Sequence, residues 1–299
     1  MVTTSRPECS SMSMSLTLKL KSHMVILRLL SKCSLRNSAN MRILVIPDAQ
    51  IKEGIPTDHL TWAGKAIVEY KPDVVVNIGD FADMPSLSSH DIKGSKYFEG
   101  LRYQKDVEAV KEAMKKLLQP LKDLQKAQKE SKHKVYKPRM VLTLGNHENR
   151  IDRAVNNNPM LEGLITVEDL EYDKDWEVHP FLHPVFINGV GFNHYWPVGA
   201  MGRPAASPAA IISKLHMSCV AGHQQGKQVA YGKRADGKPI TAIVVGSYYL
   251  HDESYMDQLS NRHWRGLLVM NEVDDGHFDE MFLSIEYLQR KYSSDETNS

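Results

Sequence analysis

Cysteine is scarce in this chain. The 299 residues include three cysteines, Cys9, Cys33 and Cys219, and their spacing follows no pattern. A disulfide framework needs paired cysteines, and it persists in oxidising compartments. We therefore expect a protein of a reducing compartment that is held together without disulfides.

A long apolar run is also missing. The most apolar early stretch, MVILRLL at Met24–Leu30, is short and contains Arg28. A membrane-spanning helix needs about 20 mostly apolar residues. We therefore expect no membrane anchor and a cytoplasmic location.

Neither sign of charge dominates the composition. The chain has 37 Lys and Arg against 36 Asp and Glu, a net charge of +1. Residues 1–40 carry six Lys or Arg and one acid, Glu8, so the rest of the chain is mildly acidic. Such a body does not attract a nucleic-acid backbone broadly, and binding of that kind would need a local basic patch.

The basic, Ser-rich residues 1–40 differ in composition from the rest of the chain, and a transit peptide shares this composition. A buried strand is expected to begin at Met41, which is a natural start for a fold. We therefore interpret residues 1–40 as a disordered extension or an upstream-start artefact. We expect a single domain over residues 41–292, with a helical insertion at about 81–138, and a disordered tail over residues 293–299.

Strands and helices alternate in the first half. Apolar runs predict strands at Arg42–Asp48, Pro72–Asp80 and Arg139–Glu148, and helical spacing predicts helices at Thr57–Lys71, capped by Thr57 or Asp58, and Gln104–Lys132. Pro120 is expected to bend or break the second helix. This alternation is typical of a βαβ-built sheet, in which ligands gather beyond the carboxyl ends of the strands.

The second half is richer in hairpins. Turn signals predict strand pairs around Asn188-Gly189 within Trp176–Trp196, around Asp236-Gly237, and around Asp274–Gly276, with a helix near Pro208–His216. These elements indicate one α/β (α+β) domain in which two β-sheets pack face to face, with helices outside.

Side chains that bind divalent cations follow several of the expected strands. They are Asp48 and Gln50 in PDAQ, Asp80 and Asp83 in GDFAD, Asn146 and His147 in GNHE, His194 in FNHYW, and His223 and Gln225 in GHQQ. Carboxylates, imidazoles and amide oxygens suit such ions, and a two-metal site needs a carboxylate that bridges. One such group is weak evidence, but the ordered set indicates a metal centre.

In their order these motifs resemble the calcineurin-like metallophosphoesterases, whose pattern is D-x-H, G-D-x-x-D, G-N-H-E/D, a lone H and G-H-x-H. The resemblance covers residues 41 to about 250, and small phage and bacterial members are closest in style. It implies a four-layer sandwich of two packed mixed β-sheets flanked by helices. The expected cytoplasm would be that of the host if the protein is phage-encoded.

The resemblance also implies roles for single residues. Asp80 would bridge two divalent ions, with Asp48 on the first and Asn146, His194 and His223 on the second. His147 would be catalytic, with Asp83 orienting its imidazole. The implied reaction is hydrolysis of a phosphate mono- or diester by a metal-bound hydroxide, with His147 assisting the leaving group.

Two glutamines depart from the family pattern. Gln50 and Gln225 stand where the family has the two histidines of the first ion. If both offer amide oxygens, the first ion has an all-oxygen shell, which favours Mn²⁺, with Mg²⁺, Fe²⁺ or Zn²⁺ as alternatives. Otherwise the first site is weak or absent, and the protein works with one metal.

Substrate contacts are harder to predict. Arg150 is a candidate phosphate contact, although a structural salt bridge is the commoner role for it and for Glu148. His90, on a loop after GDFAD, and His251, in GSYYLHDESY, are weaker candidates. The tyrosines of that second segment either stack a base or pack in a strand. The expected substrate is a phosphorylated small molecule, a nucleotide or a nucleic acid.

Two other functions remain open. A nuclease or phosphodiesterase of the same family would use a basic patch, which Lys93, Lys96, Arg102 and Lys105 supply modestly. A catalytically weakened module that binds a metal or a partner is favoured by the two glutamines. The intact Asp80, Asn146, His147, His194 and His223 oppose it.

Overall fold

The computed structural model describes residues 41–88, 100–253 and 260–293. The expectations for residues 1–40, for His90, Lys93 and Lys96, and for residues 294–299 lie outside this part of the chain. Ser293, expected in the tail, is instead the last residue of helix α6 (Ile285–Ser293). None of the helices in the described ranges combines the length and apolar character needed to cross a membrane.

A six-stranded mixed sheet carries the first three expected strands. Its order is β11-β10-β1-β2-β3-β4, with β1 to β4 parallel and β10 antiparallel to both of its neighbours. The strands are β1 (Met41–Ile46), β2 (Val74–Asn77), β3 (Arg139–Thr143), β4 (Glu177–His179), β10 (Gly266–Asp274) and β11 (His277–Ser284). The hairpin of β10 and β11 turns between Asp274 and His277, as predicted.

A five-stranded mixed sheet contains the other two hairpins, with the order β5-β6-β7-β9-β8. Its strands are β5 (Val185–Ile187), β6 (Val190–Asn193), β7 (Ser218–Ala221), β8 (Lys227–Lys233) and β9 (Pro239–Val245). The turns at Asn188-Gly189 and Asp236-Gly237 lie where the sequence predicts them. The sequence predicts one strand pair within Trp176–Trp196. This segment also contains a third strand, β4, which joins the first sheet.

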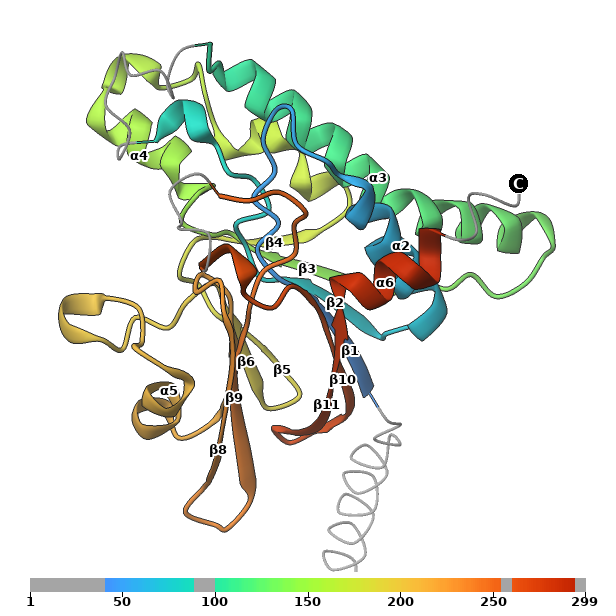
Figure 1. Ribbon diagram of the computed structural model, residues 1–299, viewed down its shortest axis with the longest axis vertical. Helices are drawn as coiled ribbons and strands as arrows, with labels where there is room; N and C mark the ends of the chain where they lie inside the picture. The colour runs from blue at the N-terminus through green and yellow to red at the C-terminus, as the bar shows by residue number, and fades with distance from the viewer. Residues whose placement is uncertain (1–40, 89–99, 254–259, 294–299) are drawn as a thin grey trace, which may run out of the picture. The chain divides into compact units, whose positions relative to one another are not determined.

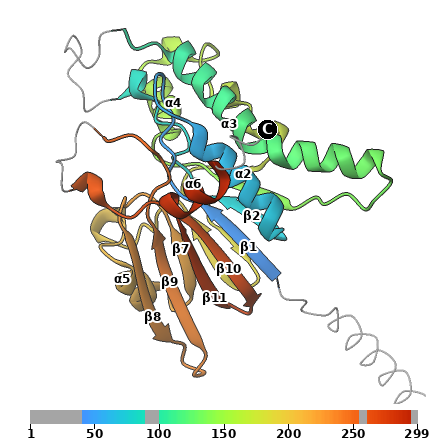
Figure 2. The same ribbon diagram turned by 45° about the vertical axis from the view of Figure 1, so that its right-hand side comes forward.

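Alternation along the strands produces four layers. In β1, Ile43 and Val45 enter the core between the sheets, whereas Leu44 and Ile46 enter the core beneath the helices. Helices α2 (Asp58–Tyr70), α3 (Tyr103–Glu130) and α6 cover the first sheet, and α5 (Pro208–Leu215) covers the second (Figures 1 and 2). A fold of two mixed sheets flanked by helices is therefore confirmed.

The sequence predicts that Pro120 bends or breaks its helix, and the break is excluded for α3. The helix runs unbroken through Pro120 and packs against α2, where Gly64 allows close approach. A Cβ at Gly64 would lie 2.3 Å from the carbonyl oxygen of Leu117 and 2.9 Å from the Pro120 ring. Thr57 precedes α2 but does not cap it with its side chain; its Oγ1 accepts a hydrogen bond from Lys116 Nζ at 2.8 Å.

The parallel strands of both sheets bring their carboxyl ends to one region. Residues after β1 and β9 meet through a bridge between Asp48 and Ser247, and Ile51 bridges Ala82 after β2. Loops from both sheets thus converge on one edge, where the side chains with metal-binding chemistry are found.

Candidate metal and catalytic site

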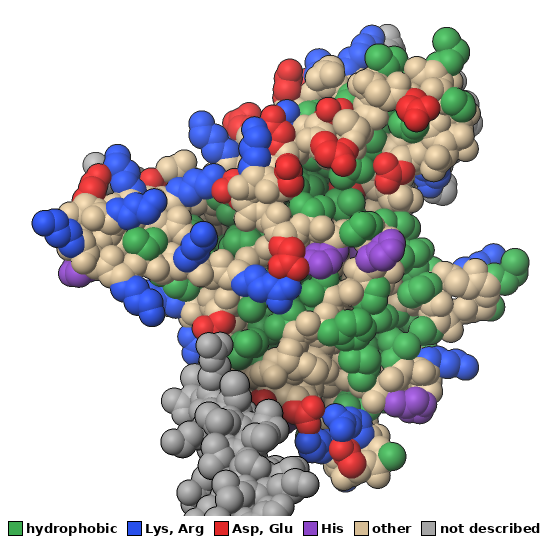
Figure 3. All heavy atoms as spheres, turned by 180° about the vertical axis from the view of Figure 1, so that it is seen from behind, with side chains coloured by type: hydrophobic (Ala, Val, Ile, Leu, Met, Phe, Trp, Pro, Cys, Tyr) green, Lys and Arg blue, Asp and Glu red, His purple; other side chains and the backbone are tan. Residues whose placement is uncertain are grey.

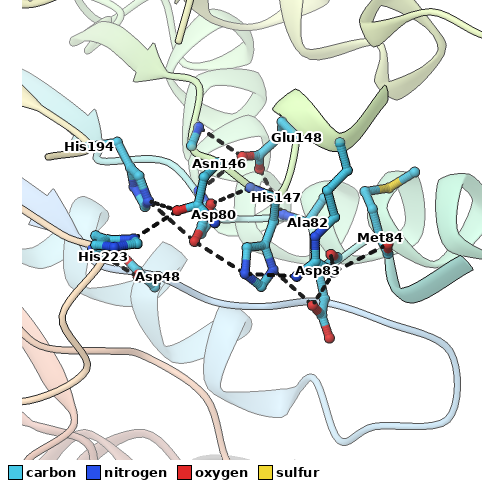
Figure 4. Close-up of polar contacts among 12 residues, drawn as sticks. Asp48, Asp80, Ala82, Asp83, Met84, Asn146, His147, Glu148, His194 and His223 are labelled. Carbon is cyan, nitrogen blue, oxygen red and sulfur yellow. Dashed lines mark hydrogen bonds and ion pairs between the residues drawn. The ribbon is translucent and has the colours of Figure 1, made fainter. Parts of the chain in front are cut away.

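Four side chains converge where the expected second ion would lie. Donor atoms of Asp80, His194 and His223 lie within 4.8 Å of one another. Asn146 Oδ1 lies 2.9 Å from His194 Nε2 and 2.7 Å from His223 Nδ1 (Figure 4). The two histidines follow strands of the second sheet, whereas Asp80 and Asn146 follow strands of the first.

The tautomer of His194 shows why this cluster fits a cation. Its Nδ1 donates a hydrogen bond to the Ile78 carbonyl oxygen at 3.0 Å, so Nε2 of the neutral ring carries a lone pair. That lone pair faces Asn146 Oδ1 at 2.9 Å and Asp80 Oδ2 at 3.2 Å, which are also acceptors. A cation placed among these atoms, or protonation of His194, removes the conflict.

The charges of these side chains influence one another strongly. Burial lowers the pKa of His194, but the Asp80 carboxylate outweighs it and raises the pKa to about 9. Burial also opposes the charge on Asp80, yet His147 and His194 together hold the Asp80 pKa well below its usual range. Burial and the charge on His194 lower the pKa of His223 to about 4. The ligand set therefore favours an anionic Asp80 and a neutral His223.

Asp48 and Gln50 follow β1 and are the residues that the family resemblance places at the first ion. Asp48 is fully buried, and its Oδ2 accepts a hydrogen bond from the His223 backbone N–H at 3.0 Å. Burial is the largest cause that raises the Asp48 pKa to about 8. Gln50 has a left-handed backbone, with a φ of 47°, and its buried Oε1 has no hydrogen-bond partner. A buried amide oxygen that has no partner among the described residues fits a ligand for a hard cation.

Gln225 differs from Gln50 in its surroundings. Its Oε1 accepts a hydrogen bond from Tyr249 Oη at 3.1 Å. An amide oxygen has two lone pairs, so this bond leaves one for another partner. The two glutamines, which the sequence treats as a pair, are thus unequal: one oxygen is free and the other is held by a tyrosine.

His147 and Asp83 form the expected imidazole and carboxylate pair. Asp83 Oδ1 lies 2.8 Å from His147 Nδ1, and the His147 backbone N–H donates to Asp80 Oδ1 at 2.8 Å. Burial opposes ionisation of Asp83, but His147 and Lys52 lower its pKa to about 2. Burial lowers the pKa of His147, and Asp80 and Asp83 outweigh it, so that pKa is raised.

Arg150 lies at the other nitrogen of that imidazole. Its Nη2 is 3.1 Å from His147 Nε2, and its Nη1 donates to the Asp83 carbonyl oxygen at 2.9 Å. Its ion pair with Asp83, at 3.4 Å, is of the structural kind expected for it. The guanidinium is therefore fixed beside Nε2 of His147, the residue that the family resemblance makes catalytic.

Within the described part of the chain, Glu148 does not form the salt bridge that its sequence context suggested. Its side chain is fully buried and accepts hydrogen bonds from three backbone N–H groups, those of Asp80 at 3.0 Å, Ala82 at 2.9 Å and Gly145 at 2.8 Å. Burial is the largest cause of its raised pKa. Glu148 thus ties the loop after β2 to the loop after β3, a role that its place in GNHE did not reveal.

The segment after β9 lies beside this site. Tyr248 and Tyr249 are fully buried, so they pack in the protein and do not offer a face to a base. His251 stacks on Tyr249, and its Nε2 lies 2.6 Å from Glu253 Oε1. Sequence reasoning missed Lys52 and Glu253. Lys52 pairs with both Glu253 and Asp83. The one signal in the sequence was that Lys52 lies two residues after PDAQ.

Comparison with known proteins agrees with this geometry. The family model described as calcineurin-like phosphoesterase matches residues 41–228. A solved crystal structure matches 81% of this chain and 99% of its own at 10% identity, with a TM-score of 0.32 that is too low to support a conclusion. A comparison with curated proteins gave no match.

Proposed function

Because the chain belongs to the calcineurin-like phosphoesterase family, we propose that it hydrolyses a phosphate mono- or diester with two divalent cations. The family consists of metal-dependent phosphoesterases. The observation that carries the proposal is the convergence of Asp80, His194 and His223 within 4.8 Å, with Asn146 between the imidazoles. These residues come from both sheets, and their donor atoms face one another as the ligands of a cation would.

The metal ligands divide into two sets. Asp80, Asn146, His194 and His223 would hold one cation, and Asp48, Asp80, Gln50 and Gln225 the other. Divalent cations, when bound, neutralise phosphoryl charge and lower the pKa of water. The ligands of the first ion, Asp48, Asp80, Gln50 and Gln225, offer only oxygen atoms. This set, with the free Gln50 oxygen, supports Mn²⁺ over Zn²⁺ at the first site.

The chain's own residues would handle the leaving group. Asp83 accepts the Nδ1 proton of His147 and fixes the ring. In the doubly protonated imidazole, which the raised pKa of His147 favours, Nε2 would carry the proton that is given to the departing oxygen. Arg150 lies beside Nε2, where its guanidinium can bind phosphate oxygens. The substrate would thus replace the contact between Arg150 and His147.

A phosphorylated small molecule or nucleotide is the substrate class we favour over DNA. Lys105, part of the expected basic patch, is paired with Glu53 at 2.9 Å. On the face drawn in Figure 3, Lys and Arg side chains gather over the arm at left, where the end of α3 and the residues after it carry exposed Lys126, Lys129, Lys132 and Lys134. The metal ligands instead follow the carboxyl ends of the strands.

The test is hydrolysis of mono- and bis-aryl phosphates, nucleotides and single-stranded DNA by metal-free protein refilled with Mn²⁺ or Zn²⁺. We expect hydrolysis of an ester that needs metal and is faster with Mn²⁺. Equal or faster turnover with Zn²⁺ would contradict the oxygen-rich first site. Absence of turnover with every metal would favour the weakened binding module.

Substitution of His147 tests its assignment. We expect His147→Ala to lower kcat by about 100-fold or more, the range for general acid catalysis, with metal content unchanged. The measurements are steady-state kinetics and metal analysis of the same sample. Loss of metal together with activity would show that His147 holds the metal centre and does not transfer the proton.

A further inference from the structure

Lys52 joins two carboxylates that come from distant segments of the chain. Its Nζ lies 2.9 Å from Asp83 Oδ2 and 2.9 Å from Glu253 Oε2. The side chains are largely buried, with exposed fractions of 23% for Lys52, 11% for Asp83 and 2% for Glu253. An ion pair in such surroundings is screened less than one on the surface, and its geometry is more tightly fixed.

Glu253 is itself held in place. Its backbone N–H donates to Asn261 Oδ1 at 2.9 Å, and its carbonyl oxygen accepts from Asn261 Nδ2 at 3.1 Å. Its Oε1 lies 2.6 Å from His251 Nε2. The carboxylate at this end of the contact is therefore anchored by backbone and side-chain bonds that do not involve the metal ligands.

The two oxygens of Asp83 have different partners. Oδ2 is taken by Lys52, and Oδ1 faces His147 Nδ1 at 2.8 Å. Rotation of the carboxylate out of its plane would break a largely buried ion pair, so Lys52 holds the orientation in which the other oxygen meets the imidazole. A chain of contacts thus runs from Glu253 through Lys52 and Asp83 to His147.

We propose that Lys52 and Glu253 form a brace that holds Asp83 against His147, which makes Lys52 a positioning residue for proton transfer to the leaving group. The inference rests on the proposed function and extends it to a residue that never touches substrate. It also assigns a role to the segment after β9, whose His251 and Glu253 support the far end of the brace.

The test exploits the leaving group. An alkoxide needs protonation as it departs, whereas nitrophenolate does not. We expect Lys52→Met to lower kcat about 10-fold or more for an alkyl phosphate ester, and about threefold or less for the 4-nitrophenyl ester. KM should change less than about twofold, because no substrate contact is lost. Lys52→Arg should restore most of the alkyl activity.

The matched control is Lys122→Met, which removes an exposed lysine of α3 that is paired with Asp175. It should leave both esters unaffected. Because Lys52→Met removes the lysine that two buried carboxylates share, Glu253→Gln serves as a second, milder variant. It should show the same selective loss on the alkyl ester. An equal loss on both esters, or no loss, would overturn the brace.

A crystal structure of Lys52→Met gives a readout that is independent of activity. We expect the contact between Asp83 Oδ1 and His147 Nδ1 to be lost, with the metal ligands unmoved. If Asp83 stays in place, the brace is refuted even where the wild type is active. If the wild type hydrolyses no ester, the proposed function fails, and this distance alone decides whether Lys52 positions Asp83.

Discussion

At the scale of single residues, the two glutamines that replace family histidines are not equivalent. Gln50 keeps a buried amide oxygen without a partner, whereas the Gln225 oxygen is bound by Tyr249. A leucine at either position would remove the ligand atom, and a glutamine keeps it. Of the two, Gln50 is therefore the stronger candidate for a direct ligand of the first ion.

His59 is a second residue with unusual surroundings, because it is fully buried and both ring nitrogens lack hydrogen-bond partners. Burial, with smaller effects of His251 and Lys116, lowers its pKa to about 3. In the unfolded chain this histidine has its ordinary pKa and is protonated below about pH 6.5. The folded protein keeps it neutral down to a much lower pH. Stability that depends on His59 is thus present above about pH 6.5 and is lost as the pH falls toward 3.

We expect His59→Leu to reduce this acid sensitivity. Between pH 6 and pH 4 the wild-type free energy of unfolding should fall more steeply than that of the variant, by up to about 1.4 kcal/mol per pH unit for one proton. Urea unfolding at several pH values measures the slopes. Parallel slopes for the two proteins would show that His59 does not titrate on unfolding in this range.

At the scale of elements, the site depends on how the loops after β2 and β3 are joined. Glu148 accepts hydrogen bonds from backbone N–H groups of both loops, and Gly145 permits the two loops to approach closely. A Cβ at Gly145 would lie 2.1 Å from Asp80 Oδ1. The position of Asp80, the expected bridging ligand, is therefore set by contacts between neighbouring loops as well as by its own strand.

Glu148→Gln tests this connection. The amide has one acceptor oxygen in place of two, so at least one backbone donor is left unsatisfied, at a cost of about 1–3 kcal/mol. We expect lower stability and weaker metal binding, measured by urea unfolding and by calorimetric titration with Mn²⁺. The control is Glu162→Gln, an exposed position that should change neither. Unchanged metal affinity in Glu148→Gln would show that Glu148 does not position the metal ligands.

At the scale of the whole molecule, the expected ligands come from both sheets. Asp48, Asp80 and Asn146 follow strands of the first sheet, and His194 and His223 follow strands of the second. We therefore expect metal binding to stabilise the packing of one sheet on the other, because the unfolded chain does not hold these residues together.

Removal of metal should accordingly lower the melting temperature. Mn²⁺ at 100 times its dissociation constant adds about 2.7 kcal/mol to the free energy of unfolding through linkage. We expect chelation to remove this stabilisation and Mn²⁺ to restore it, as followed by differential scanning calorimetry. In His194→Ala the metal-dependent shift should be much reduced. A melting temperature that changes with neither chelator nor Mn²⁺ would refute the metal centre.

Sequence reasoning predicted the strands, the hairpin turns and the convergence of strand ends. These depend on local signals, such as apolar runs, Asn-Gly and Asp-Gly turns, and polar residues directly after strands. It left open whether Pro120 bends or breaks its helix, and α3 continues through Pro120, whose ring lies close to Gly64. It also expected a salt bridge for Glu148, because no local signal shows that a carboxylate will accept hydrogen bonds from backbone N–H groups of another loop.

The sequence by itself determined the fold class and the family, because both depend on the order of short motifs and on the periodicity of apolar residues. Tertiary structure alone decided that Gln50 is free while Gln225 is held, that Lys52 and Glu253 reach Asp83, and that Tyr249 is buried. The physical reason is that these contacts join segments far apart in the chain, and their geometry is fixed only when the two sheets pack.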